Sequence, residues 1–92
     1  MSRGYFTYIV RCCDGSLYTG WTVDPERRVR QHNAGRGARY TRSHRPVELV
    51  YCQAHASRAE AMRYEQTIKN MTRACKLALV EQVGISGPPG TE

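Results

Sequence analysis

The chain has 92 residues, the size of a single domain, and 40% of them are hydrophobic, which is enough for a globular core. It contains no apolar run of about 18 residues and no signal-peptide layout, so we expect a cytoplasmic protein without a membrane span. The net charge of +6 favours a polyanionic partner, with nucleic acid as the first candidate.

The first elements along the chain form a predicted β-hairpin. Residues 5–12 and 17–22 are rich in β-formers, and Asp14-Gly15 between them is a turn signal. Each strand carries a tyrosine, Tyr8 in the first and Tyr18 in the second. Both side chains could simply pack in the sheet, or they could contribute phenolic oxygens to a site.

A helix is predicted from Pro25 to about Asn33. Asp24 can cap this helix, and Pro25 suits its first turn. Arg28 and His32 are four positions apart and therefore share one helix face. On that face they could hold a phosphate and shuttle a proton, or they could form an ordinary solvated surface.

An arginine-rich loop is predicted over residues 34–46. Gly35 and Gly37 loosen this segment, and Pro46 opposes a helix just before it. From Arg27 to Val47 the chain holds seven arginines and no acid. The planar guanidinium group suits phosphate, which favours nucleic acid over the alternative of a basic surface without a dedicated partner.

Residues 47–53 are predicted to form a third strand, followed by two helices. Ser57 and Glu60 fit a capping box at the start of the first helix. Its buried stripe recurs at helical spacing and consists of Ala61, Tyr64, Ile68 and Met71. A last helix is predicted over 72–83, so that one domain spans 1–83 and a flexible tail spans 84–92. The order β-β-α-β-α-α predicts an α+β fold with a small three-stranded antiparallel-type sheet flanked by helices.

Four cysteines occur, and none belongs to a CxxC motif or to a Cys/His pair at zinc-finger spacing. Cys12 and Cys13 are neighbours in sequence and are poorly placed to bridge each other, because adjacent strand residues point to opposite faces. We therefore expect thiols in a reducing compartment.

Glu65 is the best candidate for a metal ligand. Hydrolysis of a phosphodiester needs a cation to offset the phosphate charge, and magnesium often takes only one or two carboxylates. Glu65 lies at the edge of the buried stripe and has no local structural role, although an exposed surface position is the alternative. Other acids have a predicted turn, cap or tail position: Asp14, Asp24, Glu60 and Glu92.

Together these residues resemble the GIY-YIG nuclease family, in particular its small stand-alone bacterial members (the YhbQ-type group). They also resemble the related nuclease domain of structure-specific repair endonucleases. The first motif is YIV at Tyr8–Val10, with Thr7 in place of the name-giving glycine, and the second is YTG at Tyr18–Gly20. The segment PERRVRQHN and the later RYEQTIK at 63–69 complete an ordered set within residues 5–80.

The resemblance implies a role for each matching position. Tyr8 and Tyr18 would include the group that activates the attacking water, and which of the two does so stays open. Arg28 would contact the phosphate and stabilise charge in the transition state. His32 would support the site, and Glu65 would bind one divalent metal ion, magnesium or manganese.

Other positions near these motifs also have implications for the site or for substrate binding. Gly20 would permit a close approach of the backbone. Trp21 follows it, where some relatives carry a lysine linked to base activation, so the resemblance implies that this route is unavailable here. Tyr40 could stack on a base. The residues expected to contact nucleic acid are Arg27, Arg36, Arg39, Tyr40, Arg42, Arg45, Lys69 and Lys76.

A site shared by both tyrosines constrains the hairpin. If the turn had two residues, Tyr8 would pair with Trp21, and Tyr18 would lie on the opposite face of the sheet. We therefore predict a loop of odd length or a bulge near Cys13–Ser16.

The sequence thus predicts a metal-dependent endonuclease that hydrolyses DNA. Such a small domain should select single-stranded or branched DNA rather than a long duplex sequence. One alternative is a nucleic-acid-binding domain without cleavage activity, whose affinity would fall steeply with salt. Another is a basic module that binds a protein partner, which would predict an exposed apolar patch. The sequence indicates no oligomeric state.

Overall fold

A three-stranded antiparallel sheet in the order β2-β1-β3 forms the centre of the fold. The computed structural model describes residues 4–85. Its elements are β1 (Tyr5–Cys12), β2 (Leu17–Thr22), α1 (Pro25–Asn33), α2 (Arg39–Arg42), β3 (Val47–His55), α3 (Arg58–Lys69) and α4 (Arg73–Gln82). The sheet and its helices confirm the predicted α+β class, and α2 is a four-residue helix inside the predicted arginine-rich loop.

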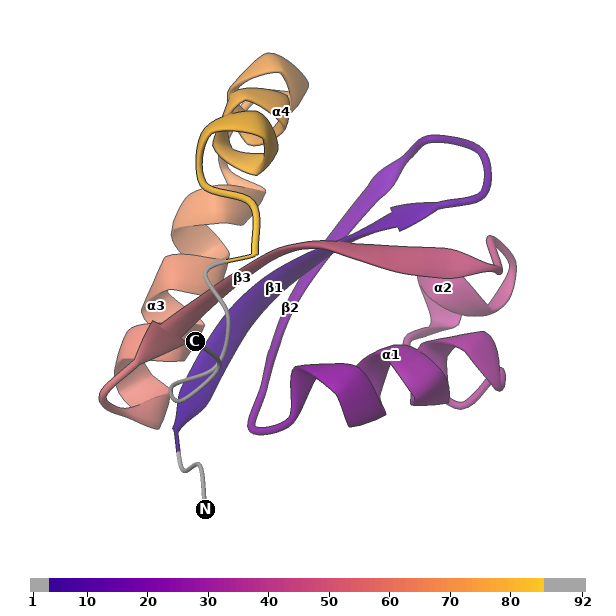
Figure 1. Cartoon of the computed structure of the whole chain (residues 1–92), viewed down its shortest axis with the longest axis horizontal. Coiled ribbons are helices and arrows are strands. Elements are labelled where there is room, and N and C mark those ends of the chain that lie inside the picture. The colour runs from indigo at the N-terminus through magenta and orange to yellow at the C-terminus, as the bar shows by residue number, and fades with distance from the viewer. Residues whose placement is uncertain (1–3, 86–92) are drawn as a thin grey trace.

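Helices cover both faces of the sheet. Figure 1 shows α1 and α2 on one side and α3 and α4 on the other. Each face has its own core, because side chains alternate along the central strand β1. Tyr8 and Val10 pack on the side of α1, together with Val29 from that helix. Ile9 packs on the side of α3, together with Ile68.

The hairpin loop between β1 and β2 contains three residues. The amide of Cys12 donates to the carbonyl of Ser16 at 2.8 Å, which closes the loop around Cys13, Asp14 and Gly15. Gly15 has φ +89°, a left-handed conformation that glycine adopts without strain. The odd loop length predicted from the sequence is therefore confirmed.

The loop length sets which side chains share a face. Tyr8 lies opposite Gly20, and Val10 lies opposite Tyr18. Directly paired residues in an antiparallel sheet point to the same side, and so do residues two apart in one strand. Tyr8 and Tyr18 therefore both face α1.

The helices begin at the caps that the sequence suggests. The side chain of Asp24 accepts from the amide of Arg27 at 3.1 Å at the start of α1. At the start of α3, Ser57 accepts from the amide of Glu60 at 3.1 Å, and the Glu60 carboxylate accepts from the amide of Ala56 at 3.2 Å. These contacts confirm the predicted Asp24 cap and the Ser57 half of the capping box, whereas Glu60 reaches the amide of Ala56, one residue before the N-cap.

Thr7 ties the sheet to α3. Its side chain is fully buried, and its hydroxyl donates to the carbonyl of Ala61 at 2.9 Å. The same oxygen lies 3.0 Å from Nε2 of His55, which therefore donates to it. Thr7 thus joins β1, β3 and α3 through one hydroxyl.

The last described residues lie against β3. The amide of Cys52 donates to the carbonyl of Gly84 at 3.3 Å, and Cys52 forms a parallel bridge with Ile85. Residues 86–92 of the predicted tail lie outside the described residues. Cys12, Cys13 and Cys75 form no disulfide, as expected for thiols. Within residues 4–85, no helix has the length and apolar character needed to span a membrane.

Candidate active site

A buried hydrogen bond joins Tyr8 of β1 to His32 of α1. Both side chains are almost fully buried, and Oη of Tyr8 lies 2.9 Å from Nε2 of His32. The hairpin register directs Tyr8 toward α1, and the last turn of α1 directs His32 toward the sheet. The pair therefore follows from the contact between these two elements.

Thr41 determines which nitrogen of His32 carries the proton. The Thr41 hydroxyl donates to the carbonyl of Ala38 at 3.0 Å, so its oxygen accepts from Nδ1 of His32 at 2.7 Å. In neutral histidine Nε2 is then the unprotonated nitrogen, and the Tyr8 hydroxyl donates to it. A directed chain of hydrogen bonds runs from Tyr8 through His32 to Thr41 and into α2.

The surroundings keep both members of the pair neutral near pH 7. Burial raises the pKa of Tyr8 to about 12, although a hydrogen bond and the positive charge of Arg28 act in the opposite direction. Burial also lowers the pKa of His32 to about 4, and the charge of Arg28 contributes to that decrease. His32 is thus an uncharged acceptor beside a protonated phenol.

Two glycines make room for these rings. A Cβ atom on Gly20 would lie 2.6 Å from the Tyr8 hydroxyl oxygen, and one on Gly37 would overlap the His32 ring. The Tyr8 ring thus lies directly against the backbone of Gly20. Gly37 and Thr41 could not be predicted as part of the site, because only the path of the loop places them beside His32.

Tyr18 and Glu65 complete the set of residues around Tyr8. The Tyr18 ring packs edge-on against His32, with ring centroids 5.5 Å apart. The negative charge of Glu65 on α3 contributes to the raised pKa of Tyr8, after burial as the largest cause. The Glu65 carboxylate lies 3.2 Å from Nζ of Lys69. Charged groups from both helical layers, Arg28 on α1 and Glu65 on α3, therefore act electrostatically on one phenol.

The residues expected to contact nucleic acid form two groups. Those of α1, α2 and the connecting loop are all exposed: Arg27, Arg36, Arg39, Tyr40, Arg42 and Arg45. Lys69 and Lys76 come from α3 and α4, and they line a cavity together with Tyr18 and with Tyr40 of the first group. Arg45 also has a structural role, because its guanidinium donates to the carbonyl of Arg42 at 3.1 Å and to that of Asn33 at 3.4 Å.

The sequence matches the family described as the GIY-YIG catalytic domain over residues 4–78. The chain belongs to the GIY-YIG family. Domains of this family are generally nucleases, and this membership suggests DNA as the substrate.

Relatives of similar length support the same assignment. The UPF0213 protein SH2523 of Staphylococcus haemolyticus is 50% identical over 78 residues, which cover 85% of this chain and 95% of that protein. The UPF0213 protein HQ_3675A of Haloquadratum walsbyi is 50% identical over 82 residues, covering 89% and 92% of the two chains. This GIY-YIG chain therefore resembles small stand-alone members of the family, as predicted.

Solved structures share the fold. The solution NMR structure of the UPF0213 protein BH0048 from Bacillus halodurans is 44% identical and superposes with a TM-score of 0.58, covering 88% of this chain and 86% of that one. The NMR structure of EF2693 from E. faecalis is 36% identical, with a TM-score of 0.56 and coverage of 86% and 88%. Both confirm the GIY-YIG fold expected from the sequence.

GIY-YIG nucleases typically use a divalent metal ion. The described part of the chain contains no group of three or more His, Cys, Asp or Glu side chains that could hold one. Glu65 fits a different kind of site, in which one carboxylate binds magnesium and water or substrate supplies the other ligands. Its side chain is 15% exposed, so the carboxylate remains accessible from the surface.

Proposed function

We propose that this protein is a metal-dependent endonuclease that hydrolyses DNA phosphodiester bonds and selects single-stranded or branched DNA. The hydrogen-bond chain from Tyr8 through His32 to Thr41 supports this proposal most directly. A buried, oriented acceptor behind a phenol serves proton transfer. Arg28 and Glu65 lie close enough to act electrostatically on the same phenol.

In the proposed reaction, Tyr8 and His32 together accept the proton of the attacking water. As the water oxygen bonds to phosphorus, Oη of Tyr8 takes the water proton and passes its own proton to Nε2 of His32. The bond between phosphorus and the leaving oxygen breaks, and that oxygen takes up a proton from solvent. His32 becomes an imidazolium that donates from both nitrogens, to Tyr8 and to Thr41.

Arg28 couples substrate binding to this proton transfer. Its positive charge contributes to the low pKa of His32. A phosphate bound to Arg28 would offset that charge and therefore raise the pKa of His32. Bound substrate would thus make His32 a better proton acceptor during the reaction.

Glu65 would hold the metal ion. When bound, such an ion offsets negative charge on the phosphate oxygens. Lys69 is the group now paired with the Glu65 carboxylate, at 3.2 Å. This ion pair is also the observation that favours the second candidate, a nucleic-acid-binding domain without cleavage, because an ammonium group occupies the carboxylate.

Cleavage of labelled single-stranded, branched and duplex DNA with magnesium or manganese tests the proposal. We expect Tyr8→Phe and Glu65→Gln each to reduce the cleavage rate by about 100-fold or more, since each removes a group of the reaction centre. Glu26→Gln is a matched control, because Glu26 is an exposed carboxylate in the first turn of α1. It should cleave like the wild type.

Two outcomes would contradict the proposal. Equal cleavage by the wild type and Glu65→Gln would remove Glu65 from the metal site. DNA binding by the wild type without cleavage of any substrate would favour the binding domain instead.

A further inference from the structure

A cavity beside the candidate active site combines aromatic and cationic side chains. Its volume is about 300 Å³. Four elements contribute to its wall: β2, α2, the end of α3, and α4. The lining residues are Leu17, Tyr18, Thr19, Tyr40, Lys69 and Lys76. Tyr18 belongs to both this cavity and the group around His32, so the two places are contiguous.

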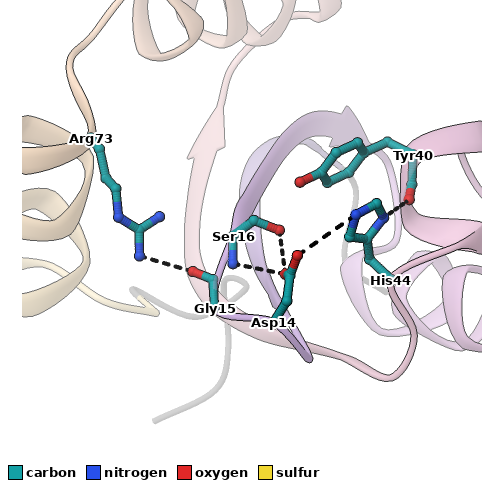
Figure 2. A network of polar contacts seen from close by, with 6 residues as sticks. All are labelled: Asp14, Gly15, Ser16, Tyr40, His44 and Arg73. Carbon is teal, nitrogen blue, oxygen red and sulfur yellow. Dashed lines mark hydrogen bonds and ion pairs between the residues drawn. The ribbon is translucent and has the colours of Figure 1, made fainter.

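Tyr40 presents a fixed aromatic surface to this cavity. Its side chain is 42% exposed, yet its ring stacks on that of His44 at a centroid distance of 4.1 Å and an interplanar angle of 12°. His44 is itself held, because Nδ1 donates to the carbonyl of Tyr40 at 2.6 Å and Nε2 lies 3.7 Å from the Asp14 carboxylate. Figure 2 shows this network. An exposed ring held in one place is a ready surface for stacking.

The rings of Tyr18 and Tyr40, which both line the cavity, are nearly parallel. Their ring planes differ by 14° and their centroids are 6.3 Å apart. An aromatic ligand stacked on Tyr40 would therefore lie nearly parallel to the ring of Tyr18, which contacts His32.

The cationic wall is also fixed in place. Arg73 at the start of α4 donates to the carbonyl of Gly15 at 2.9 Å, which ties α4 to the hairpin loop (Figure 2). Lys76 is one turn further along the same helix. Within residues 4–85 no acidic group pairs with Lys76, whereas Lys69 is paired with Glu65. An aromatic surface beside an ammonium without a counter-ion suits a planar ring that carries a negative charge.

We propose that this cavity holds one unpaired nucleotide of the DNA substrate, next to the phosphate that is cleaved. The base would stack on Tyr40, and the phosphate of that nucleotide would bind Lys76. A base within a duplex has both faces covered by its neighbours and must leave the stack to enter such a cavity. The cavity therefore selects unpaired DNA. This inference rests on the proposed function, because it names the form of substrate for the same site.

Binding measurements without metal test the cavity separately from cleavage. The probes are a labelled oligothymidylate and an abasic sugar-phosphate strand of equal length, measured by fluorescence anisotropy in EDTA. We expect the wild type to bind the thymidylate about 10-fold more tightly than the abasic strand, as one stacked base would provide. Tyr40→Phe should keep this difference, and Tyr40→Ala should abolish it.

The salt dependence of binding tests the proposed contact between Lys76 and the phosphate. Lys76→Met should weaken binding of both strands and reduce the slope of log affinity against log salt by about 0.7, the value for one phosphate of a single strand. Arg58→Met is the matched control, because Arg58 is an exposed cation at the opposite end of α3. It should leave the affinity for both strands and the salt slope unchanged.

The outcomes distinguish the cavity from the nuclease. Equal affinity of the wild type for both strands, or an unchanged preference in Tyr40→Ala, would overturn the cavity proposal. If these results accompanied cleavage that depends on Glu65, the nuclease function would stand without the cavity. A preference for thymidylate that depends on Tyr40, without any cleavage, would support the cavity and contradict the nuclease.

Discussion

The Glu65 carboxylate has two possible partners, the ammonium of Lys69 and a divalent cation. Nζ of Lys69 lies 3.2 Å from Oε2 of Glu65, one helical turn away. Lys69 is 42% exposed and also lines the cavity with Tyr40, so its flexible side chain can leave the carboxylate and remain near a bound phosphate. A metal ion at Glu65 must displace this pair.

Removing Lys69 should therefore tighten metal binding. We expect Lys69→Met to lower the dissociation constant for Mn²⁺ by up to about 5-fold, since an exposed ion pair contributes at most about 1 kcal/mol. Isothermal titration calorimetry measures this constant. Glu65→Gln should lose the binding, and weaker binding by Lys69→Met would show that the lysine does not compete.

The predictability of the site differs between its residues. Arg28 and His32 could be paired from the sequence, because four positions place them on one face of a capped helix. Thr41 could not be found in this way. Its contact with His32 depends on the path of the loop through α2, and no periodicity describes that path.

At the level of elements, the hairpin determines the geometry around Tyr8. Three loop residues place Gly20 opposite Tyr8, and the missing side chain of the glycine leaves space for the phenol. The strands and helix caps were predictable because their signals are local. The helix α2 was not, because its N-cap Ala38 provides no side-chain hydrogen bond.

A side chain at position 20 should disturb the hydrogen-bonded pair of Tyr8 and His32. In Gly20→Ala the new Cβ would lie 2.6 Å from Oη of Tyr8, so the phenol must shift from His32. We expect a loss of about 1–3 kcal/mol in the free energy of unfolding, the usual cost of overpacking, and a loss of DNA cleavage. Urea denaturation and the cleavage assay measure the two effects.

Gly4→Ala is the control for this experiment. A Cβ on Gly4 would have only ordinary contacts, at 3.9 Å. Its stability and cleavage should match the wild type. If Gly20→Ala were equally unaffected, the close approach to Tyr8 would have no functional consequence.

At the scale of the whole molecule, charged side chains from the two helical layers act on the same phenol, that of Tyr8. The sequence order predicted the sheet with its flanking helices, since each amphipathic element must bury one face. Element order by itself did not show that Glu65 of α3 would act on a phenol that faces α1, which only the resemblance to the nuclease family implied. That meeting depends on how α3 packs across β1 and β2, which is a property of the assembled layers.

The stability of the molecule should depend on pH through its buried histidine. His32 has a pKa of about 4 in the folded state, below the ordinary value of 6.5. The unfolded chain therefore binds more protons between these values, and the free energy of unfolding falls as the pH falls from about 6.5 to 4. His55, whose pKa is also lowered by burial, acts in the same direction.

Urea denaturation at pH 7 and pH 5 measures this effect. We expect His32 to contribute a loss of roughly 2 kcal/mol at pH 5, which is about 1.5 pH units into the window. His32→Gln should show a correspondingly smaller difference between the two pH values. Equal slopes in the wild type and His32→Gln would mean that His32 is protonated in the folded state at pH 5.

The helix α2 combines two kinds of position within a single turn. Thr41 is fully buried against His32, whereas Arg39, Tyr40 and Arg42 are exposed. Substitutions at the three outward positions can alter which strand the loop accepts, while a substitution at Thr41 also alters the hydrogen bond that orients His32. In the proposed nuclease, such a segment would let substrate preference diverge during evolution while the buried contact between Thr41 and His32 is inherited unchanged.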